Sequence, residues 1–176
     1  MGQDKGLIAT QTTNWAGLAL EKMSSLNIPV VLSVNNRQKT SYQAIFSSEI
    51  LIPDNPGLPL KGPLAGILSI HLQYPANDLF VLACDLPYME LALLNDLYIT
   101  QNGRSQVYLY SNDGEPEPLC GIYTADGLNT ILLLLQSGGL AKHSMKYALE
   151  RLLVDLRPIP ENKKDAFTNV NSPHAS

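Results

Sequence analysis

The sequence is poor in the residues that build disulfide frameworks and zinc sites. It has 2 cysteines, Cys84 and Cys120, which form no CxxC pair. Its 3 histidines, His71, His143 and His174, stand at no spacing to these cysteines that is typical of zinc ligands. These absences argue against a disulfide-stapled secreted domain and against zinc, and they are typical of a protein from a reducing cytoplasm.

Long hydrophobic runs and an excess of positive charge are also absent. Apolar runs such as Ile131–Leu135 are far too short to cross a membrane, and no charged start precedes an apolar signal segment. The net charge is −4 and the pI is about 5.3. Nucleic-acid and anionic-membrane surfaces need clustered Lys and Arg, so we expect neither partner. Any nucleotide bound here is expected to be a small ligand in a local site of a cytoplasmic protein.

The composition is that of a folded globular protein. The 176 residues are 45% hydrophobic and 16% charged, and no linker or repeat divides them, so we expect a single domain over 1–176. Short apolar strands alternate with helical periodicity, which predicts an α/β fold in three layers, helix–sheet–helix, around a mostly parallel sheet. The expected strands are 30–34, 50–52, 79–83, 106–110, 118–124 and 153–156; the expected helices are 14–26, 41–47, 63–74, 91–103, 128–136 and 141–152.

The stretch from Asp78 to Pro87 is the most informative of these elements. Five apolar residues, Leu79–Ala83, predict a strand buried on both faces, and Asp85 follows where the strand leaves the sheet. The carboxyl ends of strands line the ligand crevice of open α/β sheets, and a carboxylate there suits a hard cation such as Mg²⁺. Alternatively, Asp85 caps the turn or helix that follows.

A second candidate site is the helix start at Gly62-Pro63-Leu64-Ala65-Gly66. Proline is tolerated in a first helical turn, and the free amides there attract an anion. Close packing of this small-residue segment on the sheet is a compatible structural role. Other polar residues carry weaker signals: Glu115 and Glu117 are expected to be solvated turn acids, and Lys142 and His143 to be exposed in the first turn of helix 141–152.

Four motifs along the chain point to one family: Met1-Gly2-Gln3-Asp4-Lys5, Gly62-Pro63-Leu64-Ala65-Gly66, Cys84-Asp85-Leu86-Pro87 and Phe167-Thr168-Asn169-Val170-Asn171-Ser172-Pro173. In order and spacing they resemble the molybdenum cofactor guanylyltransferases, which are nucleotidyltransferases related to the sugar-phosphate nucleotidylyltransferases. Residues 117–123 are similar to the family's central strand. Each motif alone is weak, but four in order across nearly the whole chain are specific.

The resemblance implies a role for each matching residue. Lys5 matches the lysine that meets the nucleotide phosphates, and Asp85 matches the Mg²⁺ ligand. Asp54 matches an acid on the guanine side, where a carboxylate accepts from N1–H and the exocyclic amine. The other matching positions are Ser33 or Asn35 and Gly62 on the nucleotide side, and Asn169 and Asn171 near the second substrate and phosphates.

The reaction implied by the resemblance is transfer of GMP from GTP to the terminal phosphate of molybdenum-molybdopterin, with release of pyrophosphate. Mg²⁺ is the implied cofactor, and a molybdoenzyme or a cofactor-delivery protein is a possible partner. Such chemistry needs positioning and charge neutralisation rather than a protein nucleophile. Two alternatives stay open: a related transferase that uses CTP or a sugar-phosphate acceptor, and a non-catalytic binding remnant.

The chain departs from the family at its beginning. The family opens with a strand and the loop L-A-G-G-x-S-x-R-M-G-x-D-K, whereas this sequence starts inside that signature at Met1. Loss of a central strand leaves two neighbours with unpaired backbone groups, each costing about 1–3 kcal/mol where buried. We therefore expect the chain as given to fold poorly or to be inactive unless the upstream segment is restored. The in-frame DNA upstream would decide between a mis-assigned start and a remnant.

Overall fold

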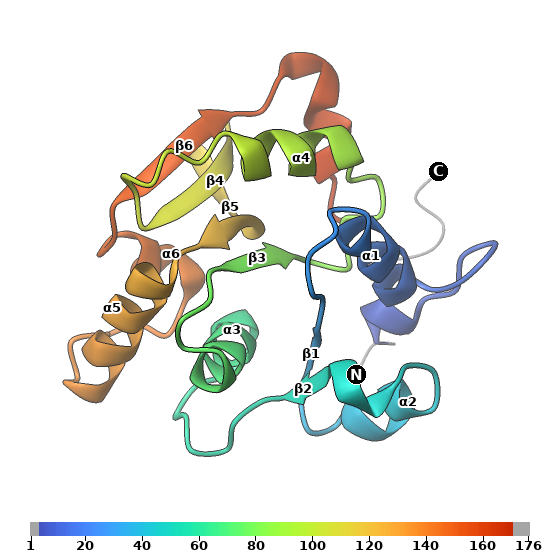
Figure 1. The fold of residues 1–176 in the computed structure, drawn as a ribbon, viewed down its shortest axis with the longest axis horizontal. Helices are drawn as coiled ribbons and strands as arrows, with labels where there is room; N and C mark the ends of the chain where they lie inside the picture. The colour runs from blue at the N-terminus through green and yellow to red at the C-terminus, as the bar shows by residue number, and fades with distance from the viewer. Residues whose placement is uncertain (1–3, 171–176) are drawn as a thin grey trace.

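The computed structural model describes residues 4–170, which form two β-sheets with helices packed against them (Figure 1). The smaller sheet pairs β1 (Leu32–Val34) with β2 (Leu51–Pro53) in parallel. The larger sheet has the order β3-β5-β4-β6. Its strands are β3 (Leu79–Leu82), β4 (Val107–Asn112), β5 (Glu115–Tyr123) and β6 (Val154–Pro158).

Three of the four strands in the larger sheet run in the same direction, although the sheet is mixed. β3 and β4 both run antiparallel to β5, and β6 runs parallel to β4, so β5 alone runs against the others. The helices are α1 (Trp15–Ser24), α2 (Lys39–Gln43), α3 (Pro63–Gln73), α4 (Leu91–Ile99), α5 (Ala125–Gln136) and α6 (Met145–Leu149). Three 3₁₀ segments complete the described chain: η1 (Lys5–Leu7), η2 (Ser48–Ile50) and η3 (Glu161–Phe167).

Strand alternation along β4 builds a hydrophobic core on each face of the larger sheet. Tyr108 and Tyr110 join a cluster with α4, the end of α1 and η3, whereas Val107 and Leu109 join one with α3, α5 and α6. All four side chains are almost completely buried. Successive strand residues point to opposite faces, so this pattern places helices on both sides. Figure 1 shows α4 and α3 on opposite sides of the sheet, and the predicted α/β class is confirmed.

Local sequence signals explain where the first helices begin. Asn14 caps α1, because its side-chain oxygen accepts from the backbone N–H of Gly17 at 2.8 Å. Pro63 occupies the first turn of α3, and Gly62 before it has φ of 73°, a left-handed conformation that favours glycine. Along 4–170, no helix is long and apolar enough to cross a membrane.

Three expectations about individual elements need correction. The four residues of β3 are only half-buried rather than buried on both faces, because β3 ends its sheet and pairs only with β5 among the described strands. The helix expected over 141–152 is shortened to α6, so Lys142 and His143 precede it, although both are exposed as expected. The strand expected over 118–124 starts earlier, at Glu115.

Candidate functional site

The centre of the candidate site is an ion pair between Lys5 and Asp85. The Lys5 ammonium lies 2.9 Å from Asp85 Oδ2, although the two residues are 80 positions apart. Lys5 belongs to η1, and Asp85 follows the carboxyl end of β3. Their side chains are 42% and 21% exposed, so both remain accessible to a ligand. The structure therefore brings together the two residues that the sequence assigns to phosphate and metal binding.

The loop that carries Asp85 is fixed by contacts from both ends of the chain. The backbone N–H of Val170 donates to the Asp85 carbonyl at 3.1 Å, and Lys22 Nζ of α1 donates to the Pro87 carbonyl at 2.6 Å. Leu86 also packs in the same core cluster as Phe167 of η3. These contacts place the closing segment with Asn169 beside Asp85. Asn171, also predicted in this segment, lies outside the described residues.

The nucleotide-side residues gather at the end of the smaller sheet. A Cβ added at Gly66 would lie 2.2 Å from Ser33 Oγ and 3.6 Å from Asp54 Oδ1, so the first turn of α3 packs directly against both side chains. The Asp54 N–H donates to the Val34 carbonyl at 2.9 Å, which extends the β1–β2 pairing by one bond. Burial raises the pKa of Asp54 above its usual value. Ser33, Asp54 and the helix start thus share one corner.

Asn35, the alternative to Ser33, has a local structural role instead. Its side-chain oxygen accepts from the backbone N–H groups of Arg37 at 2.9 Å and Gln38 at 3.1 Å, which is an Asx turn. Gly62 caps α3 through its carbonyl, which accepts from the backbone N–H groups of Ala65 at 3.0 Å and Gly66 at 3.4 Å. Pro63 has no N–H, so in this first turn the Leu64 amide is left for another acceptor. Cys84 connects the Lys5–Asp85 pair with the corner formed by Ser33, Asp54 and the start of α3. It precedes Asp85 and packs against the cluster that contains Val34.

Asp4 and Tyr42 belong to the site but were missed from the sequence. Asp4 Oδ1 accepts from the Gly6 N–H at 3.0 Å and from the Tyr42 hydroxyl at 3.2 Å, so it supports the turn that carries Lys5. Asp4 could have been found from the sequence, because it directly precedes Lys5 in the first motif. Tyr42 had none, because its contact with Asp4 crosses 38 residues.

A divalent cation fits this site only as part of a metal–nucleotide complex. Among residues 4–170 no group of three or more His, Cys, Asp or Glu side chains could hold a metal by itself. Asp85 offers one accessible carboxylate at a strand end. Mg²⁺ is commonly held by one or two carboxylates, with substrate phosphates and waters completing its octahedral coordination. The donor set of this chain is consistent with that arrangement.

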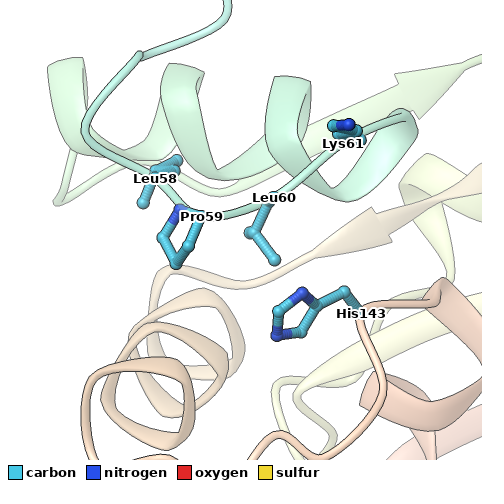
Figure 2. A pocket seen from close by; sticks show the side chains of 5 residues that line it. All are labelled: Leu58, Pro59, Leu60, Lys61 and His143. Atoms are coloured by element: carbon cyan, nitrogen blue, oxygen red, sulfur yellow. The ribbon is translucent and has the colours of Figure 1, made fainter.

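A separate hollow lies next to the loop that leads into α3. It has a volume of about 530 Å³ and is lined by Leu58, Pro59, Leu60, Lys61 and His143. Figure 2 shows the His143 ring pointing toward Leu60. The lining contains no carboxylate and none of the predicted site residues. It therefore lacks the carboxylate that commonly holds the Mg²⁺ of a metal–triphosphate group.

Glu117 differs from the solvated turn acid predicted for it. It lies within β5 and is half-buried, and burial raises the pKa of its carboxyl. Within 4–170 its carboxylate has no hydrogen-bond or ion-pair partner. Glu115 does match the expectation: it is exposed, and its carboxylate meets Lys146 Nζ at 2.7 Å. The desolvated charge of Glu117 therefore opposes folding at neutral pH.

We expect Glu117→Gln to stabilise the protein at neutral pH but not in acid. A carboxyl whose folded pKa is raised loses stability as pH rises from its ordinary value of 4.5 through the raised value. Glutamine removes that loss, so the melting temperature should increase at pH 7 and match that of the wild type well below pH 4.5. Glu115→Gln, which removes an exposed charge, should give no such increase. An equal shift at both pH values would contradict this explanation.

Comparison with known proteins agrees with this geometry. Residues 1–152 match the MobA-like NTP transferase domain. The chain belongs to this family. A molybdenum cofactor guanylyltransferase from Shewanella piezotolerans is 24% identical over 173 residues, which cover 98% of this chain and 81% of that protein. A probable molybdenum cofactor guanylyltransferase from a Geobacillus species is 30% identical over 138 residues, or 78% of this chain and 67% of the relative.

Solved structures show that the MobA-like fold extends over nearly the whole chain. Molybdopterin-guanine dinucleotide biosynthesis protein A from Archaeoglobus fulgidus superimposes with a TM-score of 0.75 at 21% identity, covering 98% of this chain and 86% of that one. A Mycobacterium tuberculosis protein solved in complex with manganese gives a TM-score of 0.59 at 13% identity, covering 90% and 83%. The resemblance expected from the four motifs is confirmed at the level of family and fold, and the family is one of nucleotidyltransferase enzymes.

Proposed function

We propose that this protein transfers GMP from GTP to molybdenum-molybdopterin and releases pyrophosphate. The observation that carries the proposal is the ion pair between Lys5 and Asp85, with the segment that bears Asn169 held beside it. In this proposal Lys5 offers a cation to the phosphates, Asp85 a carboxylate to a metal and Asn169 a side-chain amide to the second substrate. The relatives named as guanylyltransferases support the choice of reaction.

The reaction makes and breaks one bond at the α-phosphorus of GTP. An oxygen of the molybdopterin phosphate forms the new P–O bond, and the bond between the α-phosphorus and the bridging oxygen to the β-phosphate breaks. The electron pair of that bond leaves with pyrophosphate. A phosphate oxygen is already a nucleophile, so the protein supplies position and charge rather than a covalent intermediate. Burial, helped by the Asp85 carboxylate, raises the pKa of the nearby Cys84 thiol to about 11, which leaves it a poor nucleophile.

Lys5 is the residue proposed to hold the triphosphate. Its ammonium is a compact charge on a flexible stem, and the Asp85 carboxylate balances it when no nucleotide is bound. The flexible stem would allow the ammonium to turn from Asp85 to phosphate oxygens. Asp85 would then be available to Mg²⁺, which when bound neutralises phosphate charge as a Lewis acid. The first turn of α3 adds the Leu64 amide and the positive end of the helix dipole for an anion.

Asp54 is the proposed selector for guanine. Its carboxylate lies beside Ser33 and the first turn of α3. Guanine presents two donors on one edge, N1–H and the exocyclic amine, and these suit the two oxygens of a carboxylate. Adenine presents an acceptor at N1 and would leave Asp54 poorly paired. Asn169 and Asn171 are proposed to contact molybdopterin or the phosphates.

Isothermal titration calorimetry with GTP, CTP and ATP in the presence of Mg²⁺ tests the nucleotide assignment. We expect GTP to bind at least roughly tenfold more tightly than either competitor, a difference of about 1.4 kcal/mol. Asp54→Ala should reduce that preference while leaving a common affinity for the triphosphate. A clear preference for CTP would replace guanylyl transfer with the cytidylyl alternative.

A further inference from the structure

The turn that carries Lys5 is too short to fix that side chain by itself. η1 has only 3 residues, and a single 3₁₀ turn has weak hydrogen-bond geometry. One carboxylate oxygen compensates for this. Asp4 Oδ1 caps the turn by accepting from the Gly6 N–H at 3.0 Å, and it also accepts from the Tyr42 hydroxyl at 3.2 Å. The direction in which Lys5 leaves the backbone thus depends on a contact with α2.

Tyr42 is buried where it meets this turn and packs against the smaller sheet and Phe46. Its side chain is 4% exposed and packs with Val34 and Leu51 of the smaller sheet. Its ring makes a tilted contact with Phe46, with 5.7 Å between the centroids. Burial and the Asp4 carboxylate raise the pKa of Tyr42, so its hydroxyl remains a proton donor at physiological pH.

Gly6 shows how closely the turn is seated on Tyr42. A Cβ added at Gly6 would lie 2.0 Å from the Tyr42 hydroxyl oxygen, nearer than real Cβ contacts allow. The Gly6 backbone therefore rests on the hydroxyl itself. The smaller sheet that anchors Tyr42 also carries Ser33 and leads into Asp54. The position of Lys5 therefore depends on the same small sheet that holds Ser33 and leads into Asp54, the residues proposed to contact the nucleotide.

We propose that Tyr42 is a positioning residue for guanylyl transfer, acting through Asp4 to aim the Lys5 ammonium at the nucleotide phosphates. The inference rests on the proposed function, because it gives Lys5 a substrate to meet. Its consequence is specific: the hydroxyl of Tyr42, rather than its ring, should matter for turnover. Loss of that hydroxyl leaves the ring packing intact but frees the Lys5 turn, and small misplacement of a catalytic group is costly.

Tyr42→Phe tests this proposal against Tyr108→Phe. Tyr108 is the control because it is also buried and its hydroxyl lies away from the site. That hydroxyl donates to Asn102 Oδ1 at 3.1 Å and accepts from the Ser105 N–H at 3.0 Å. We expect Tyr42→Phe to lower kcat roughly tenfold with little change in the KM for GTP. Tyr108→Phe removes two hydrogen bonds, so it should cost at least as much stability, and it should leave kcat unchanged. An Asp4→Asn variant, which keeps an acceptor oxygen, should retain more activity than Asp4→Ala.

The rate at which Lys5 is acetylated by an amine-reactive reagent, followed by mass spectrometry, gives a second measurement that needs no substrate. Tyr42→Phe should raise this rate several-fold, and Tyr108→Phe should not. Unchanged kcat and unchanged acetylation in Tyr42→Phe would overturn the proposal, as would equal effects of the two variants. If the wild-type protein transfers no nucleotide, the proposed function fails, while the acetylation rates still show whether Tyr42 holds Lys5.

Discussion

Replacing Asp85 with Asn is expected to abolish Mg²⁺-dependent guanylyl transfer while the fold survives. The substitution keeps the size of the side chain and an oxygen that accepts from Lys5, but it removes the charge that binds a cation. Removal of one group that stabilises transition-state charge costs about 10²–10³ in kcat, and we expect a loss of at least this size. Initial rates with GTP, Mg²⁺ and molybdenum-molybdopterin measure it.

Asp113→Asn is the matched control for this experiment. Asp113 is also a carboxylate paired with a lysine, since its Oδ1 lies 3.0 Å from Lys164 Nζ, but its side chain is 81% exposed in the turn between β4 and β5. Its φ of 50° is one that Asn tolerates. Activity should be unchanged in this variant. Retained transfer in Asp85→Asn, with the melting temperature of both variants near that of the wild type, would return Asp85 to the capping role.

The largest effect on stability is expected from Leu94→Ala. Leu94 of α4 is completely buried in the core that also contains Leu86, the residue after Asp85, and Phe167 of η3. Truncation of a buried leucine costs the transfer free energy of the lost atoms and leaves a cavity. We expect the free energy of unfolding to fall by about 2–5 kcal/mol, as measured by urea denaturation.

Leu133→Ala provides the comparison for Leu94→Ala. Leu133 lies on α5 and is 65% exposed, so the same chemical change should alter stability by no more than about 0.5 kcal/mol. If both variants lost the same free energy, the core assigned to α4 and η3 would not be the one that stabilises the molecule. A loss confined to Leu94→Ala is the result that its burial predicts.

Local signals in the sequence predicted the elements and part of the site. Asn14 and Pro63 mark helix starts through capping and ring geometry, which depend only on neighbouring residues. Asp85 was predicted because it directly follows an apolar run, and the structure places it at the end of β3 beside Lys5. The family was predicted from motifs that stand in order along the chain. The helix starts, the strand end at Asp85 and the family motifs can all be predicted from a few neighbouring residues.

Features set by distant contacts were not predictable from one sequence. The bond between Tyr42 and Asp4 joins α2 to the cap of η1, and no local pattern connects these two segments. The half-burial of Glu117 depends on elements packed around β5, and the half-burial of β3 depends on how many strands flank it. The short α6 follows from its Ser144 cap, where the side chain accepts from the Tyr147 N–H, although the apolar spacing alone favoured a longer helix.

Transfer of label from GTP tests the central claim most directly. The protein is incubated with Mg²⁺, molybdenum-molybdopterin and GTP labelled at the α-phosphorus, and the dinucleotide product is separated from pyrophosphate. Guanylyl transfer predicts that the label enters the molybdopterin product and that one pyrophosphate appears for each label transferred. CTP labelled at the same position should transfer little. Label that stays in GTP, or that enters the product only from CTP, would contradict the account.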